Sequence, residues 1–409
     1  MKQRHDAEYW RKCNNKLCLY SREKLKGTDR MRVLILSNID MGLYKFRKEL
    51  MEELVKDYDV YFCVPDGEYV EKIKRMGCKF ISCNVLDRRS TNPIKDLKLV
   101  KFYNETLTKI KPDIVLTYTI KPNIYGGLVS TRKRLPYIAN VTGLGTTIEN
   151  GGLLAQISTT LYRIGLKKAQ CVFFQNKNNQ LLFTVKGIVK GKTRLIPGSG
   201  VNLAMHFLED YPSDKDGIRF LFVGRIMKDK GIEELLSAIK NIHRTREDVV
   251  LDLVGFCDED YSDNLAEAEK EGAIVNHGIQ SDVHPFYKAC HCTVLPSYHE
   301  GMANVMLEAS STGRPVITTG VPGCQETFDE GITGFGCEAK NVESLEETMV
   351  KFLMLSQEKR KEMGLAARKK MVREYDRNIV INAYKEEINA VKHIHKKMEN
   401  KHYGTLRKN

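Results

Sequence analysis

Short segments that are apolar at every position recur along the chain and alternate with stretches of helical spacing. The first is RVLILS at residues 32–37, and the next stretch, KFRKELMEELVKD, repeats its apolar residues every three to four positions. Strands that are apolar throughout are buried on both faces, as in parallel sheets covered by helices. The pattern predicts an α/β chain of βαβ units. Further segments of the first series are VYFCVP, KFISCNV, DIVLTY, YIANVT and CVFFQN, with helices expected at 95–110 and 176–186.

The series starts a second time near Ile218. Its segments are RFLFVGR, VLDLVGF, AIVNHG, CTVLPS and PVITTG, followed by a helical C-terminal part that we expect to be interrupted near residues 375–377. The stretch 198–217 holds turn formers and charges and is interpreted as a linker. The sequence therefore predicts two doubly wound, Rossmann-like domains, residues 31–199 and 200–390, whose last helices have the length to return to the first domain. A basic extension, residues 1–30, expected to be disordered, and a basic tail, residues 391–409, flank them.

The net charge of +13, from 65 Lys and Arg against 52 Asp and Glu, is unevenly distributed. The first domain carries +14, the second −11, and each flanking segment +5. A surplus of positive charge suggests an anionic partner. A nucleic-acid channel between domains would have basic walls on both sides, so we expect no nucleic acid. A single basic domain instead fits a protein that binds an anionic membrane with one of its faces.

The sequence predicts a cytoplasmic protein that is peripheral on the inner face of the cell membrane. It has no uncharged apolar stretch of about 18 residues and no signal-peptide core. Its 11 cysteines are scattered without metal-site spacing, which fits a reducing compartment, and Cys63, Cys171 and Cys257 are expected to be buried. Residues 153–170 have an apolar face beside basic residues, which fits either an interfacial helix or an ordinary packing helix.

The segment 294–334 predicts a strand, a loop with Glu300, and a helix starting near Ala303 that carries Glu308. A helix N-terminus at the carboxyl end of a parallel strand favours anions, and Gly301 allows close approach of a ligand. Ionised carboxylates accept hydrogen bonds from hydroxyl groups. This loop is a candidate site for a phosphorylated, hydroxyl-rich ligand. The alternative is that Glu300 only faces the helix dipole and Glu308 is a solvated helix residue.

Two cations follow the strand that ends at Gly224. Arg225 and Lys230 precede a helix, so they are expected at the same carboxyl edge of the sheet. A planar guanidinium and an ammonium group can together hold a diphosphate. Solvated loop cations are the alternative interpretation.

Taken together, these segments resemble the retaining GT-B glycosyltransferases of family 4 (group 1), in the branch that builds bacterial capsules, O-antigens and other lipid-linked glycans. The resemblance rests on FVGRIMKDKGIEELLSAI, the E-x(7)-E pair, the following GRPV and the downstream GITG, and it extends to IKPDIVLTYTIKPNIYGGLVS in the first half. It covers about residues 31–390. It implies a GT-B fold, in which an acceptor-side domain and a nucleotide-sugar domain face a central cleft.

The resemblance also implies roles for individual residues. Catalysis would rest on Arg225, Lys230 and Glu300. The donor would contact Gly42, His299, Gly301, Met302, Ala303, Asn304 and Glu308. Acceptor-side candidates are Arg88, Arg89, Asn140, Thr142 and Gly143, although Arg88 and Arg89 also fit solvated loop charges. Many relatives have a histidine near the donor sugar where this chain has NVTGLGTT, so sugar recognition there stays open.

The expected reaction is transfer of a hexosyl group with retention, from a nucleotide sugar to a polyprenyl-diphosphate-linked glycan. A UDP-sugar is favoured as donor, and no metal or other cofactor is expected. No second carboxylate stands in the matched motif as a nucleophile, so a front-face route is expected. A GT-B-shaped sugar-nucleotide epimerase and a basic nucleic-acid-binding protein are the alternatives. The E-x(7)-E pair with Arg225 and Lys230 argues against the epimerase.

Overall fold

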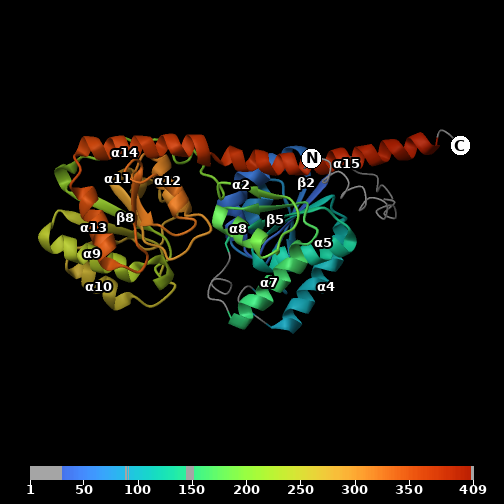
Figure 1. Ribbon diagram of the computed structural model, residues 1–409, viewed down its shortest axis with the longest axis horizontal. Helices are drawn as coiled ribbons and strands as arrows, with labels where there is room; N and C mark the ends of the chain where they lie inside the picture. The colour runs from blue at the N-terminus through green and yellow to red at the C-terminus, as the bar shows by residue number, and fades with distance from the viewer. Residues whose placement is uncertain (1–29, 88–89, 91, 144–151, 407–409) are drawn as a thin grey trace. The chain divides into compact units, whose positions relative to one another are not determined.

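The structure is a computed structural model that describes residues 30–87, 90, 92–143 and 152–406 (Figure 1). The predicted acceptor-side residues Arg88 and Arg89 lie outside the described residues. So do residues 1–29 of the predicted basic extension and residues 407–409 of the predicted tail.

The first sheet has seven strands in the order β3-β2-β1-β4-β5-β6-β7. Strand β1 pairs in parallel with β2 on one side and with β4 on the other, so the chain winds outward in both directions from β1. The strands are β1 (Arg32–Leu36), β2 (Asp59–Val64), β3 (Lys79–Ser82), β4 (Ile114–Tyr118), β5 (Tyr137–Val141), β6 (Cys171–Phe174) and β7 (Thr193–Leu195).

Helices connect these strands. A π-helical turn, η1 (Pro122–Gly126), begins the connection between β4 and β5. The α-helices of this part are α2 (Asp40–Asp57), α3 (Val70–Arg75), α4 (Pro93–Ile110), α5 (Gly127–Lys133), α7 (Gly152–Leu166) and α8 (Lys177–Val185). Helix α4 starts with Asn92 as N-cap, whose side chain accepts a hydrogen bond from Ile94 N, and with a proline at its first position.

The second sheet has six strands in the order β10-β9-β8-β11-β12-β13, with β8 and β11 at its centre. The strands are β8 (Ile218–Val223), β9 (Val249–Val254), β10 (Ile274–Asn276), β11 (Cys292–Leu295), β12 (Val316–Thr319) and β13 (Gly334–Cys337). The helices are α9 (Ile232–Thr245), α10 (Ser262–Lys270), α11 (His284–Ala289), α12 (Asn304–Ser311), α13 (Val342–Leu353), α14 (Gln357–Lys370) and α15 (Arg377–Leu406). The apolar faces of the strands and of α9 to α14 form one core cluster.

Both predicted strand series are confirmed, and so is the interruption of the C-terminal helices. A π-helical turn, η5 (Met371–Tyr375), separates α14 from α15. Two strands were not predicted. Strand β7 carries Thr193 and Arg194 and is not apolar throughout, and β13 contains two glycines in four residues. Neither therefore shows the continuous apolar run on which the prediction depended.

Contacts group the chain into two compact units. One is Met1–Ala139 with Ile164–Gln170 and Val391–Asn409, and the other is Asn140–Arg163 with Cys171–Ala390. The predicted domain bounds, 31–199 and 200–390, follow the two sheets instead and stay a prediction.

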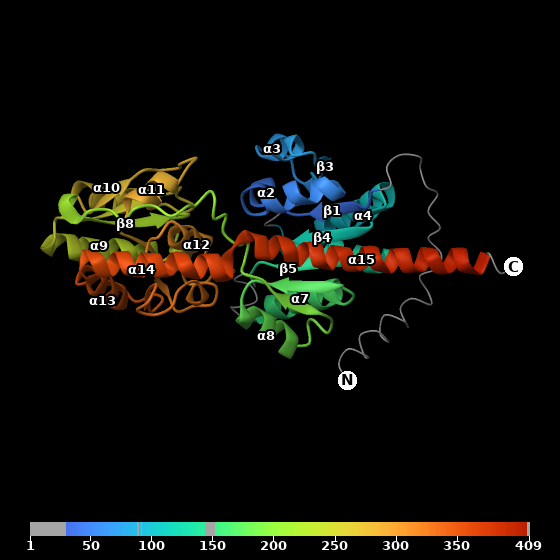
Figure 2. The same ribbon diagram turned by 90° about the horizontal axis from the view of Figure 1, so that it is seen from above.

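Helix α15, the red helix beside the β5 label in Figure 2, packs on the first sheet. Tyr384 makes this contact. The Tyr384 ring lies edge-on to Phe173 of β6, with ring centroids 4.7 Å apart. Asn140 of β5 donates to the Tyr384 hydroxyl over 2.7 Å, and Asn140 is completely buried. Asn140 therefore anchors α15, and its predicted acceptor contact stays a prediction.

The described cysteines include nine free thiols. Cys63 and Cys171 are buried in their strands, as predicted, but the prediction for Cys257 is wrong because this residue is exposed. It lies three residues beyond the end of β9, next to the exposed Phe256. Among the described residues, no helix combines the length and the apolar character needed to span a bilayer.

Candidate functional site

Two loops meet at the carboxyl edge of the second sheet, because β8 and β11 are neighbours there. The loop after β8 contains Arg225 and Lys230, and the loop after β11 contains Glu300. Backbone contacts join the two loops: Tyr298 N donates to Asp229 O over 2.9 Å, and the Ser297 hydroxyl donates to the same oxygen over 3.1 Å. The loops therefore hold one another in register.

Two glycines permit this close approach. Gly231 has φ +71°, and a Cβ there would lie 2.1 Å from Pro296 O in the neighbouring loop. Gly323 has φ +87°, and a Cβ there would lie 2.3 Å from Glu300 O. Both a left-handed backbone and the missing side chain are required at these positions. They fix where the backbone of Lys230 and Glu300 lies.

Lys230 and Glu300, predicted from separate motifs, form an ion pair. Their side chains are only 18% and 15% exposed. Partial burial strengthens the attraction between the two charges and keeps both side chains at the sheet edge. The structure therefore brings together two of the three predicted catalytic residues.

Arg225, the third predicted catalytic residue, forms an ion pair with Asp258, with Nη1 and Oδ2 2.7 Å apart. Its side chain is 42% exposed. Asp258 comes from the loop after β9, the strand beside β8. The sequence analysis did not identify Asp258, because 32 intervening residues separate it from Arg225 and only the strand order places the two side by side.

Glu308 lies on α12 and accepts a hydrogen bond from the Tyr287 hydroxyl, with the oxygen atoms 2.9 Å apart. Tyr287 belongs to α11 and is completely buried. Burial, reinforced by the nearby Glu308, raises the pKa of the Tyr287 phenol well above its ordinary value. The phenol is therefore a permanent donor to this carboxylate. Tyr287 was not predicted as part of the site.

Helix α12 begins at Asn304, as predicted, with Ala303 as its N-cap. The Ala303 amide, however, donates to Gly323 O over 2.8 Å, so the prediction that this amide is available to the donor is wrong for this conformation. Met302 and Ala303 are buried, and Gly301 and Asn304 are half-buried. These positions shape the loop beside Glu300.

His299, which was predicted to contact the donor, and His277 differ in their surroundings. His299 is half-buried, and its Nε2 lies 3.8 Å from Asp229 Oδ2 at the edge that carries Lys230. His277 contacts Asp252 Oδ1 of β9 over 2.7 Å, and Asp252 also pairs with Arg219 of β8. His277 therefore belongs to an ion-pair network that links neighbouring strands.

The remaining candidates lie after strands of the first sheet. Gly42, for which the resemblance implied a donor contact, lies inside the first turn of α2, which begins at Asp40. Thr142 and Gly143 follow β5 and are half-buried. The binding roles of these three residues stay predictions.

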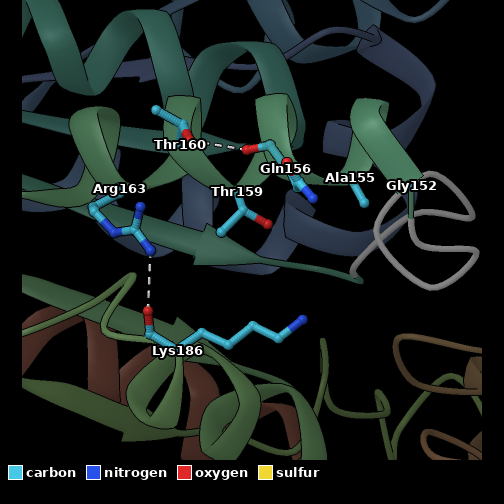
Figure 3. Close-up of a pocket in the computed structure, with 7 residues that line it drawn as sticks. All are labelled: Gly152, Ala155, Gln156, Thr159, Thr160, Arg163 and Lys186. Atoms are coloured by element: carbon cyan, nitrogen blue, oxygen red, sulfur yellow. Dashed lines mark hydrogen bonds between the residues drawn. The ribbon is translucent and has the colours of Figure 1, made fainter.

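Helix α7 covers the segment for which an interfacial or a packing helix was predicted. It packs through the buried Ala155, Tyr162 and Leu166, whereas Ile157 and Ile164 are exposed. An open groove of about 440 Å³ lies between α7 and the end of α8 (Figure 3). Its polar lining comes mainly from α7. Arg163 closes one side by donating to Lys186 O over 3.1 Å and to Gly187 O over 3.3 Å. The lining residues are Gly152, Ala155, Gln156, Thr159, Thr160, Arg163 and Lys186.

The carboxyl edge of the second sheet carries the cations of Arg225 and Lys230 and the carboxylate of Glu300, and α12 carries the carboxylate of Glu308. The cations can hold a diphosphate, and the carboxylates can accept hydrogen bonds from sugar hydroxyls. Within the described part of the chain, no group of three or more His, Cys, Asp or Glu side chains is arranged to hold a metal ion. The expectation of a metal-independent reaction stays a prediction.

The sequence matches two family descriptions. Residues 207–370 match "Glycosyl transferases group 1", and residues 32–176 match "Glycosyl transferase 4-like". Among curated proteins, the chain is 27% identical over 372 residues to the N,N'-diacetylbacillosaminyl-diphospho-undecaprenol alpha-1,3-N-acetylgalactosaminyltransferase of Campylobacter jejuni. That alignment covers 87% of this chain and 97% of the relative.

Solved structures with similar folds include sucrose-phosphate synthase from Thermosynechococcus elongatus, with a TM-score of 0.72 and 19% identity. HepE of Anabaena, solved with UDP and glucose, has a TM-score of 0.70 and 17% identity. Each alignment covers 88% of this chain and 99% of the other.

Proposed function

Because the chain belongs to the group 1 glycosyltransferases and has the two Rossmann-like sheets of the GT-B fold, we propose that it transfers a sugar from a nucleotide sugar to a polyprenyl-diphosphate-linked glycan. The donor is a UDP-sugar, the transfer retains the anomeric configuration, and the product belongs to a bacterial surface polysaccharide. The name of the Campylobacter relative supports the lipid-linked acceptor, and the UDP bound to HepE supports the donor nucleotide.

The observation that carries this proposal is the ion pair of Lys230 with Glu300 at the sheet edge. Arg225 lies in the same loop as Lys230, and Glu308 lies on α12, the helix that follows Glu300. Lys230 and Arg225 bind the diphosphate and stabilise the charge that develops on the leaving nucleotide. Glu308 accepts the ribose hydroxyls, and Glu300 accepts hydroxyls of the transferred sugar.

Retention follows a front-face route in this proposal. The acceptor hydroxyl attacks the anomeric carbon while the bond to the leaving phosphate oxygen breaks. That phosphate oxygen takes the proton of the acceptor hydroxyl. Charge stabilisation by Lys230 and Arg225 and alignment of the two substrates account for the acceleration.

The test is incubation of the purified protein with a panel of UDP- and GDP-sugars and undecaprenyl-diphosphate-linked acceptors, followed by mass spectrometry of the lipid. We expect one hexose or N-acetylhexosamine to be added from a UDP-sugar and to be cleaved by an α-specific glycosidase. An inverted linkage would contradict retention. An isomerised nucleotide sugar that forms without acceptor would favour the epimerase, and binding of oligonucleotides would favour a nucleic-acid partner.

We propose further that the protein works as a peripheral protein on the anionic cytoplasmic face of the membrane, and the first turns of α4 support this. Ile94 and Leu97 lie on the outer face of this helix and are 65% and 69% exposed. Leu99 and Tyr103, on the opposite face, are buried in the core. Exposed lysines accompany the two apolar side chains, which is the composition of a surface that binds anionic lipid. These lysines are Lys95, Lys98 and Lys101.

Replacing both Ile94 and Leu97 by serine should weaken binding to vesicles of phosphatidylcholine and phosphatidylglycerol by about tenfold or more, because two large apolar side chains no longer enter the bilayer. Co-sedimentation measures this. The control is the Ile279→Ser, Ile332→Ser variant, which removes two equally exposed apolar side chains from the acidic second domain. Equal losses of vesicle binding in both double variants, or no loss in the Ile94→Ser, Leu97→Ser variant, would contradict the assignment of the membrane-binding surface to α4.

A further inference from the structure

The hydroxyl of Tyr287 is a buried donor aimed at the carboxylate of Glu308. The phenol oxygen lies 2.9 Å from Glu308 Oε2, and the tyrosine side chain has no exposure to solvent. A hydrogen bond from a neutral donor to an ionised carboxylate is stronger than one between neutral groups. This contact therefore restricts the orientation of the Glu308 carboxylate before any ligand binds.

Tyr287 is itself fixed by a buried cation. Arg314, in the GRPV segment, is completely buried. Its Nε donates to Tyr287 O, and its Nη2 to Lys288 O, both over 2.8 Å. Nη2 also donates to Asp210 O over 2.7 Å, which ties α11 to the linker segment. The short helix α11 thus has its C-terminal carbonyls held in place.

A second contact holds α11 from the linker side. Glu209 accepts from His284 Nε2 over 3.1 Å and pairs with Lys288 Nζ at 3.2 Å. His284 and Lys288 lie near the two ends of α11, so the helix is held along its length. The arrangement leaves the Tyr287 hydroxyl little freedom to move away from Glu308.

We propose that Tyr287 is a positioning residue for nucleotide binding, which acts by orienting Glu308 toward the ribose hydroxyls. The inference rests on the proposed function, in which Glu308 accepts those hydroxyls. A carboxylate that is oriented in advance loses less conformational freedom when the ribose binds. Arg314 maintains this orientation through the backbone of α11.

The test compares the affinities of UDP and of 2′,3′-dideoxyuridine diphosphate, which lacks the ribose hydroxyls, by isothermal titration calorimetry. For Tyr287→Phe we expect binding of UDP to weaken about tenfold, as for loss of one hydrogen bond to a charged group, with binding of the dideoxy analogue within twofold of wild type. In a transfer assay the KM for the donor should rise with kcat nearly unchanged.

Tyr211→Phe is the matched control. Tyr211 is a second tyrosine of the same unit, and its hydroxyl donates to His291 O over 2.8 Å, away from Glu308. We expect Tyr211→Phe to leave both affinities unchanged. Two results would overturn the positioning role. In the first, Tyr287→Phe binds UDP as tightly as wild type. In the second, it loses affinity for UDP and for the dideoxy analogue equally.

Glu308→Ala separates this inference from the proposed function. If Glu308→Ala weakens UDP binding and Tyr287→Phe does not, the positioning role alone fails. If Glu308→Ala binds UDP like wild type, or wild type binds none of UDP, GDP and ADP, the proposed nucleotide site fails and the inference fails with it.

Discussion

Replacement of Lys230 by alanine should lower the rate of sugar transfer by roughly a hundredfold to a thousandfold, the usual effect of removing one group that stabilises a developing negative charge. Lys230 is mostly buried and pairs with Glu300. Its loss removes the cation from the diphosphate position and leaves a carboxylate facing the leaving group. We therefore expect kcat to fall together with kcat/KM, measured by release of UDP in the presence of acceptor.

Lys228→Ala is the matched control, because Lys228 lies two residues away in the same loop but is largely exposed and pairs with Glu233. It should retain activity within about twofold, as expected for an exposed ion pair. Adding Glu300→Gln to Lys230→Ala should restore part of the UDP affinity but not the transfer rate. Activity of Lys230→Ala near that of wild type would rule out its catalytic role.

Replacement of Arg314 by methionine should destabilise the protein by about 3 kcal/mol or more, since buried carbonyl groups that lose their donors each cost about 1–3 kcal/mol. Three carbonyls lie within 2.8 Å of the Arg314 nitrogens, those of Tyr287, Lys288 and Asp210. Methionine fills much of the same volume but donates no hydrogen bond. Thermal unfolding followed by circular dichroism should show a fall in Tm of roughly 6–12 °C.

Arg246→Met provides the comparison for this second variant. Arg246 forms two contacts of 2.7 Å with Asp248, but its side chain is about half exposed. An exposed pair contributes little to stability, so Tm should change by about 1 °C or less. If Arg314→Met also melts within about 1 °C of wild type, the carbonyl contacts of the buried guanidinium do not stabilise the fold.

The fold was predictable wherever a strand is apolar at every position, as in Val33 to Leu36 or Phe220 to Val223, since such a run is buried on both faces of a parallel sheet. Strands that do not show this pattern escaped prediction. Thr193 and Arg194 of β7 are half-buried. In β13, Gly334 lies close to Val316 O and Gly336 close to the Phe328 ring. Their places in the sheets come from tertiary pairing, which hydrophobic periodicity does not encode.

For the candidate site, the sequence identified the groups within short motifs but not their partners. Lys230 and Glu300 were expected at one edge because both follow parallel strands, and the structure pairs them. Asp258 and Tyr287 reach the site only through the order of strands and the placement of α11. The amide of Ala303 was misjudged because its acceptor, Gly323 O, lies 20 residues away.

The ion pair between Lys230 and Glu300 also bears on how the enzyme completes a cycle. When the sugar has been transferred, its hydroxyls no longer bind Glu300 in the proposed complex. The nucleoside diphosphate remains at the site. In the proposed reaction, Glu300, which pairs with Lys230 in the structure, then competes with the diphosphate for this cation. In that reaction, the competition of Glu300 for Lys230 favours release of the nucleotide product and binding of the next donor.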